Sequence, residues 1–117
     1  MLNIVRFEKN NAPVWGVYHD ENVFQLDITC TSTKAFLEFE RDEIKALVRT
    51  AINGQAINDP KLLSPITKDA KVLCLGANYR QHMIDSGINP EEKEFNMFFT
   101  KSAASITTPA GEIIKPS

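Results

Sequence analysis

The first quarter of the chain alternates apolar and polar residues in short runs, and this pattern restricts the fold more than any other feature. Three such runs, at residues 2–7, 13–19 and 23–27, are separated only by the turn-forming stretches KNNA and DEN. Alternation with a period of two is typical of strands that are buried on one face. Connections this short join antiparallel neighbours, so the sequence predicts a small antiparallel β-meander.

Helical signals follow the meander. Ser32 or Thr33 is suited to cap a short helical segment that extends through Phe39. A longer helix is predicted over residues 41–53, because acidic residues occupy its first turn and Gly54 follows as a stop. Its apolar residues recur at spacings of three and four, which is typical of a helix with one buried face: Ile44, Leu47, Val48, and Ala51 or Ile52.

The segment after this helix, NDPKLLSPITKDA, contains two prolines and is expected to form a connector and a domain boundary. Beyond it, KVLCLG is an apolar run without alternation, which indicates a strand buried on both faces. FNMFFTK is predicted to form another strand, and TPAGEIIKP a turn that leads into one more. The predicted fold class is therefore α+β, with mostly antiparallel strands and a few helices.

Composition excludes several classes of function. The net charge is −2, from 13 basic and 15 acidic residues, and no basic run occurs. Nucleic acid and anionic membranes are therefore not expected as partners. No apolar run approaches the length of about 20 residues that a bilayer requires, and the N-terminus lacks a signal-peptide pattern. Cys30 and Cys74 are too few and too far apart for a disulfide framework, so we expect a reducing cytoplasm.

The strand-like run KVLCLG leads directly into the polar stretch ANYRQHMID, which holds one of the two histidines of the chain. His82 and Asp85 project from one face if the segment after Tyr79 forms a helical turn. A carboxylate bonded to an imidazole fixes its tautomer and raises its basicity, which suits a general base. The same spacing also arises by accident between a surface histidine and a surface aspartate, so both interpretations remain open.

Lys101 ends the apolar run MFF and is a second candidate for a functional side chain. At a strand end its ammonium could meet a substrate carboxylate or a developing oxyanion. The alternative is a lysine that simply extends into solvent. His19 is expected to be exposed at a hairpin end, and no serine-protease motif or phosphate-binding loop is present.

The segment from Val72 to Pro116 resembles the fumarylacetoacetate hydrolase family. The resemblance rests on four elements in the family's order: a strand leading into LGANYRQH, the carboxylate after His82, the strand end FFTKSAAS, and the turn GEIIKP. The meander and helices that precede it are similar in kind to the N-terminal domain that many members carry.

This resemblance implies a metal-dependent enzyme that acts on small oxo-acids or β-diketo acids by carbon–carbon bond hydrolysis, decarboxylation or isomerisation. His82 would be the general base and Asp85 its orienting partner. Lys101 would hold substrate or stabilise an enolate, and Tyr79 and Arg80 would contact the substrate. The family cofactor is a divalent ion, magnesium, manganese or calcium. The family also implies a homodimer.

Two departures from the family pattern shape the remaining expectations. Asp85 stands where the family has a longer glutamate. The acidic metal ligands of the family follow the GEIIKP strand, so no metal ligand is assigned in this chain. We therefore expect an N-terminal fragment that is inactive alone, with a small α+β domain at residues 1–68. Residues 69–117 would begin a catalytic domain, as the first strands of a mixed β-sandwich roll. The alternatives are a non-catalytic binding or oligomerisation module and a degenerate paralogue.

Overall fold

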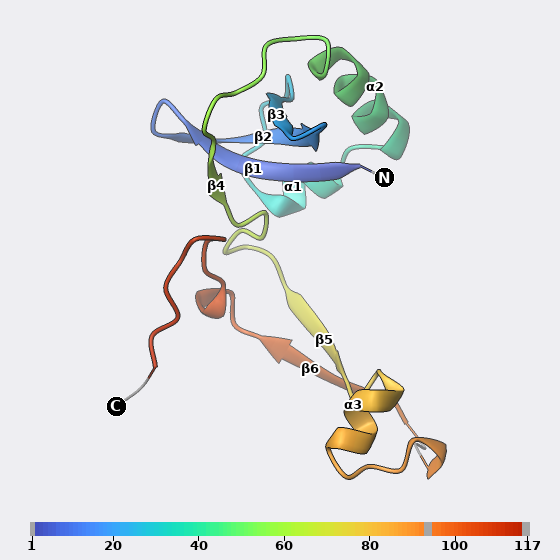
Figure 1. The fold of residues 1–117 in the computed structure, drawn as a ribbon. Coiled ribbons are helices and arrows are strands. Elements are labelled where there is room, and N and C mark those ends of the chain that lie inside the picture. The colour runs from blue at the N-terminus through green and yellow to red at the C-terminus, as the bar shows by residue number, and fades with distance from the viewer. Residues whose placement is uncertain (1, 93–94, 116–117) are drawn as a thin grey trace. The chain divides into compact units, whose positions relative to one another are not determined.

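The chain forms two compact units (Figure 1). The structure, a computed structural model, describes residues 2–92 and 95–115. One unit comprises Met1–Ala70 with Ile106–Ser117, and the other comprises Lys71–Ser105. Short antiparallel sheets and a few helices make up the described chain, which confirms the α+β class. The predicted domain boundary after residue 68 stays a prediction.

The larger unit is built on a four-stranded antiparallel sheet with the strand order β3-β2-β1-β4. β1 (Asn3–Lys9), β2 (Ala12–His19) and β3 (Asn22–Gln25) follow one another as the predicted meander. β4 (Lys61–Leu63) pairs with the other edge of β1. The prediction of a plain connector over residues 58–70 is wrong for these three residues. A strand this short has no readable alternation, and its pairing with β1 defines it.

Both hairpins of the meander close through two-residue turns in the left-handed region. The φ angles are 52° and 59° at Asn10 and Asn11, and 46° and 63° at Asp20 and Glu21. Positive φ at both central residues is the mark of a type I′ turn, whose twist matches that of the flanking strands. Asn and Asp tolerate this region better than most residues. The turns therefore fix the register in which the three strands pair.

The two helices of the larger unit begin with side-chain caps. The hydroxyl of Ser32 caps α1 (Thr33–Leu37) by accepting a hydrogen bond of 3.1 Å from a backbone N–H of the first turn. α2 (Arg41–Ala51) begins with a capping box closed by Glu40 and Glu43. Both predicted helices are confirmed, and each ends two residues earlier than the sequence suggested.

One face of the sheet packs against α2 to form the core. Trp15, Val17, Leu26, Ile44 and Val48 are all buried there and contact one another as one cluster. Removing such side chains from water is the main stabilising contribution to a domain of this size. The indole ring of Trp15 also stacks on the ring of Phe36, with centroids 4.4 Å apart.

The smaller unit is a hairpin that carries three short helices. β5 (Val72–Gly76) pairs antiparallel with β6 (Met97–Lys101), so both predicted strands are confirmed. Between them lie α3 (Arg80–Asp85) and the 3₁₀ helix η1 (Pro90–Glu92), and a second 3₁₀ helix, η2 (Ala103–Ser105), follows β6. α3 meets the condition under which His82 and Asp85 share a face, namely a helical turn after Tyr79.

Two sequence predictions about the second half of the chain are wrong, one for β5 in the smaller unit and one for residues 108–115 in the larger unit. β5 is not buried on both faces, since Leu73 is 65% exposed and Leu75 is 38% exposed. The unit has only two strands, so its described residues provide no second layer to cover them. The stretch TPAGEIIKP forms a turn but no strand over its described residues 108–115, and Pro116 lies outside them. Without a neighbouring strand to pair with, Ile113 and Ile114 stay exposed.

Candidate functional site

The exit from β5 turns the chain sharply into α3. After Gly76, Ala77 adopts a left-handed backbone with φ of 47°. A residue with a Cβ adopts this conformation at a cost of roughly 1 kcal/mol or more, and strain of this kind concentrates at functional sites. Tyr79 then returns to an extended backbone as the N-cap residue of α3. This local path brings the ANYRQH segment onto a helical turn.

α3 has one anchored face and one free face. Met83 is only 7% exposed, and both its backbone N–H and its backbone carbonyl form hydrogen bonds. Its N–H donates to the Tyr79 carbonyl at 3.0 Å, and its carbonyl accepts from Ile88 N–H at 2.8 Å. Successive residues of a helix are rotated by about 100°, so His82 projects away from this anchor and is exposed. The imidazole is therefore open to a ligand.

Asp85 lies on the same helix as His82 but has another partner. Its Oδ1 accepts a hydrogen bond of 2.8 Å from Nε2 of Gln81. Residues four apart on a helix are neighbours, which accounts for this bond. Among the hydrogen bonds of the described residues, none joins the side chains of His82 and Asp85. Asp85 would have to turn toward the imidazole, either by leaving Gln81 or through its second oxygen, before it could orient that ring.

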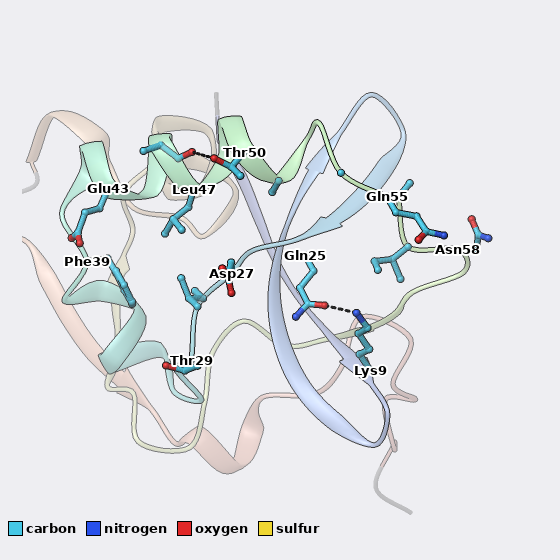
Figure 2. A pocket seen from close by; sticks show the side chains of 16 residues that line it. Lys9, Gln25, Asp27, Thr29, Phe39, Glu43, Leu47, Thr50, Gln55 and Asn58 are labelled. Carbon is cyan, nitrogen blue, oxygen red and sulfur yellow. Dashed lines mark hydrogen bonds between the residues drawn. The ribbon is translucent and has the colours of Figure 1, made fainter.

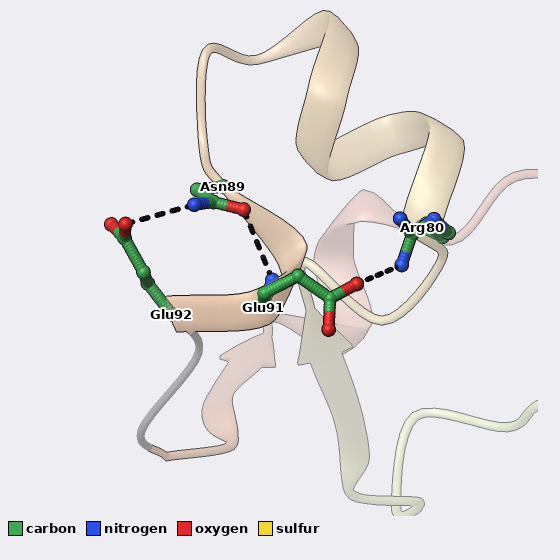
Figure 3. Close-up of polar contacts among 4 residues, drawn as sticks. All are labelled: Arg80, Asn89, Glu91 and Glu92. Carbon is green, nitrogen blue, oxygen red and sulfur yellow. Dashed lines mark hydrogen bonds and ion pairs between the residues drawn. The ribbon is translucent and has the colours of Figure 1, made fainter.

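Arg80 is engaged by the segment that follows α3 (Figure 3). Its Nη1 donates to Oε1 of Glu91, which belongs to η1. Asn89 caps that 3₁₀ turn, because its Oδ1 accepts from Glu91 N–H at 3.1 Å and its Nδ2 donates to Glu92 Oε1 at 2.8 Å. The paired side chains are largely exposed, and such pairs contribute at most about 1 kcal/mol. A substrate carboxylate could therefore compete with Glu91 for the guanidinium.

Lys101 lies at the far end of the hairpin from α3. It pairs with Val72, four residue pairs from the Met97–Gly76 pair at which β5 ends. Four residues of a strand span roughly 13 Å. The Lys101 ammonium lies 5.6 Å from the centroid of the Phe99 ring. The structure thus gathers Tyr79, Arg80, His82 and Asp85 on one short helix and its cap, and places the backbone of Lys101 apart from them.

A divalent metal is not accommodated by the described residues. No group of three or more His, Cys, Asp or Glu side chains among residues 2–92 and 95–115 is arranged to hold a metal ion. Hard divalent cations require several converging oxygen ligands. The carboxylates around α3 are instead bonded to Gln81, Arg80 and Asn89.

The larger unit contains an open pocket of about 1050 Å³ beside α2 (Figure 2). Phe39 and Leu47 supply apolar lining, and Lys9 and Gln25 meet at its rim through a hydrogen bond of 2.6 Å. None of the predicted site residues lines this pocket. Its donors and acceptors are those of ordinary surface strands and helix ends, so it is a weaker candidate for catalysis than α3.

Three residues of the smaller unit escaped the sequence analysis although each contacts a predicted site residue. Gln81 could have been found from its i, i+4 spacing to Asp85. Phe99 could have been found from its i, i+2 spacing to Lys101, since alternate residues of a strand share a face. Glu91 had no comparable signal, because its contact with Arg80 depends on how the intervening segment folds back.

Curated relatives of the chain are oxaloacetate tautomerases. YisK of Bacillus subtilis (strain 168) is 39% identical over 61 residues, covering 51% of this chain and 20% of that protein. The mitochondrial enzyme fahd2 of Xenopus laevis is 27% identical over 127 residues, covering 98% and 39%. The human mitochondrial enzyme FAHD2A is 32% identical over 99 residues, covering 81% and 30%.

The chain belongs to the fumarylacetoacetate hydrolase family. The resemblance found in the α3 region is thereby confirmed at the level of the family. No protein-family model matches the sequence, and no solved structure matches it. The chain spans between 20% and 39% of the length of these three family members. Most of each relative is therefore not represented in it.

Proposed function

We propose that this chain is part of a fumarylacetoacetate hydrolase family enzyme that interconverts the keto and enol forms of a small oxo-acid, oxaloacetate in the first instance. The observation that carries this proposal is the match to proteins named oxaloacetate tautomerase in a bacterium and in two vertebrates. The match to the Xenopus protein covers 98% of the chain and so includes nearly all of the smaller unit. It favours isomerisation over carbon–carbon bond hydrolysis and over a non-catalytic module.

The reaction moves one proton from carbon 3 of oxaloacetate to the oxygen on carbon 2, without net change in atoms. A base must take the carbon-bound proton, and a positive group must stabilise the enolate oxygen that results. His82 is the proposed base, because its imidazole is exposed and a neutral imidazole has one ring nitrogen that can accept a proton. Asp85 is its proposed orienting partner, once it exchanges Gln81 for the imidazole on the same helix face.

The remaining predicted residues are assigned to the charges of the substrate. Oxaloacetate carries two carboxylates, and the enolate adds a third site of negative charge. We assign Lys101 to the enolate oxygen, and Tyr79 and Arg80 to a carboxylate. Arg80 can form a bidentate pair with a carboxylate, and the exposed ring of Tyr79 stands next to it at the start of α3.

Further features follow from the family resemblance and stay proposals. They are a divalent ion (magnesium, manganese or calcium) held outside the described residues, a homodimer, and a mixed β-sandwich roll in the catalytic domain that residues 69–117 begin. We expect no turnover from residues 1–117 alone, since they span under two-fifths of the relatives' length. A cytoplasmic location also stays a prediction, and the Xenopus and human relatives are named mitochondrial.

The decisive experiment compares two histidine variants in the longest natural form of the protein that contains this chain. Enol oxaloacetate is supplied and its disappearance is followed by ultraviolet absorbance. His82→Gln should lower kcat by about 10²- to 10⁴-fold, the usual contribution of a general base. His19→Gln is the matched control, because His19 lies at a hairpin end of the larger unit and should leave turnover unchanged.

Two outcomes would count against the proposal. Equal turnover of wild type and His82→Gln would remove His82 as the base. Absence of tautomerase activity in the wild-type protein, tested with magnesium, manganese and calcium, would rule out tautomerisation as its reaction. Hydrolysis of acylpyruvates under the same conditions would then favour a hydrolase, and inertness toward both substrate classes would favour a binding module.

A further inference from the structure

We infer that Phe99 is a positioning residue for Lys101, with its ring holding the ammonium on one face of the β5–β6 hairpin and directing it toward the end from which α3 departs. This inference rests on the proposed function only for its catalytic consequence. The placement of the ammonium is carried by three observations in the smaller unit: the strand register, the space beside Gly76, and the distance from the ammonium to the ring.

The strand register assigns the side chains of the hairpin to two faces. Directly paired residues of antiparallel strands point to the same face, and alternate residues share it. Phe99 and Lys101 therefore lie on one face, opposite Cys74 and Val72 respectively. Phe98, which pairs with Leu75, lies on the other face. The two neighbouring phenylalanines thus offer rings to opposite sides, and only one of them can reach Lys101.

Gly76 leaves room for the Phe99 ring on that face. A Cβ placed on Gly76 would lie 3.5 Å from Cε1 of Phe99 and 3.2 Å from Sδ of Met97. The ring therefore leans along the hairpin toward Gly76, which is the end of β5 that leads into α3. Lys101 pairs with Val72 at the opposite end.

The position of the ammonium follows from these two directions. Its Nζ lies 5.6 Å from the centroid of a ring that leans away from it. The lysine side chain must therefore extend back along the strand to come that close. This direction shortens the separation of roughly 13 Å along the strand between the level of Lys101 and the exit toward His82.

The attraction between the two groups has a plain physical origin. The face of an aromatic ring carries negative potential, and a lysine ammonium within about 6 Å of its centroid is attracted to it. Phe99 is 42% exposed, so the contact belongs to the weaker class of such pairs. A contact of that class favours the held position of the ammonium by about two- to fivefold over positions in solvent.

The placement is tested directly by nuclear magnetic resonance on the protein with ¹³C-labelled lysine. The ε-methylene signal of Lys101, assigned by its loss in Lys101→Arg, should show the ring-current shift of a group near an aromatic face. Phe99→Leu should return the signal toward that of a free lysine. Phe99→Tyr, which keeps the ring, should preserve the shift, as should Phe98→Leu, which removes the ring on the opposite face.

The catalytic consequence is tested by oxaloacetate tautomerisation in the wild type and in the three phenylalanine variants. Phe99→Leu should lower kcat by about two- to fivefold, because an enolate contact is made mainly in the transition state. Phe99→Tyr, which keeps the ring, should retain the wild-type kcat, and Phe98→Leu should also leave kcat unchanged.

The two measurements separate the possible failures. An unshifted Lys101 signal in the wild-type protein overturns the inference, whether or not Phe99→Leu folds. A shifted signal with equal kcat in wild type and Phe99→Leu overturns the positioning role. A shifted signal in a wild-type protein that lacks tautomerase activity supports the placement of the ammonium and refutes the proposed function instead.

Discussion

Gly16 is a position at which the packing of the larger unit leaves no room for a side chain. It lies in the middle of β2 and is buried between two core residues, Trp15 and Val17. A Cβ added there would come within 2.6 Å of the carbonyl oxygen of Phe24 and 2.8 Å of Cε1 of Phe7. Both distances are shorter than real Cβ contacts allow, so Gly16→Ala must displace its neighbours.

The nature of those two neighbours indicates how much stability Gly16→Ala would cost. The Phe24 oxygen belongs to the backbone of the paired strand β3 and has no rotamer with which to move away. The Phe7 ring is fully buried, so it has no open space to turn into. Overpacking a filled core costs about 1–3 kcal/mol, and we expect a loss near the upper end. Domains of this kind have only about 5–15 kcal/mol of total stability.

Urea unfolding followed by tryptophan fluorescence would measure this loss. Trp15 is the single tryptophan of the chain, is adjacent to Gly16, and stacks on Phe36, so it reports on this core. With a slope of about 1–3 kcal/mol per molar urea, a loss of about 3 kcal/mol should lower the unfolding midpoint of Gly16→Ala by about 1–3 M.

Gly54→Ala controls for the general effect of replacing glycine. An added Cβ there would meet the Ala51 carbonyl oxygen at 3.2 Å, a milder contact. Phe7→Leu in the Gly16→Ala background should cost less than Phe7→Leu alone, because it relieves one of the two overlaps. A Gly16→Ala protein whose stability lies within about 0.5 kcal/mol of wild type would show that the sheet yields more easily than this packing implies.

Four further predictions follow from individual contacts. Ser32→Ala removes the cap of α1 and should cost about 0.5–2 kcal/mol in the same urea assay. Hydrogen bonding from Thr67 lowers the pKa of the Asp69 carboxyl. The stability that this hydrogen bond contributes is present above the unfolded-state pKa, and it is lost as pH falls through the lower folded-state pKa. Thr67→Val should therefore raise the midpoint of the Asp69 carboxyl titration measured by nuclear magnetic resonance. Burial raises the pKa of Cys30, so iodoacetamide at pH 8 should modify this thiol more slowly in folded protein than in urea. Amide hydrogens of β5, which pairs with one strand, should exchange faster than those of β1, which pairs with two.

The features that were predictable from the sequence are those that local residue patterns determine. The alternation of residues 2–27 and the two short turns were sufficient for the meander, and the apolar spacing was sufficient for α2. β4 escaped prediction because its three residues are a strand only through pairing with β1. The exposure of β5 escaped because burial depends on whether other layers cover the strand, which its composition does not reveal.

The same distinction between local pattern and pairing holds for the candidate site. From their spacing it was predictable that His82 and Asp85 share a face if a helical turn follows Tyr79, and α3 meets that condition. The partners of its charged groups were not, because several partners are in reach of each. Asp85 bonds to Gln81 within the helix, and Arg80 pairs with Glu91 across eleven residues. A motif thus specifies which side chains share a helix, whereas the folded segment determines which of them pair.

The predicted site residues all lie in the smaller unit, which has fewer buried core residues than the larger unit. The larger unit has a cluster of buried core residues that spans the sheet and α2, whereas Met83 is the only buried large apolar residue among the described residues of the smaller unit. A two-stranded hairpin is marginal by itself, and elements that move during binding are drawn from the low-stability end of a protein. The exchange of Asp85 from Gln81 to His82, and the release of Arg80 from Glu91, each require only that an exposed hydrogen bond or ion pair be broken. Such contacts are weak in water, so the substrate binding proposed above can rearrange them without disturbing the buried core of the larger unit.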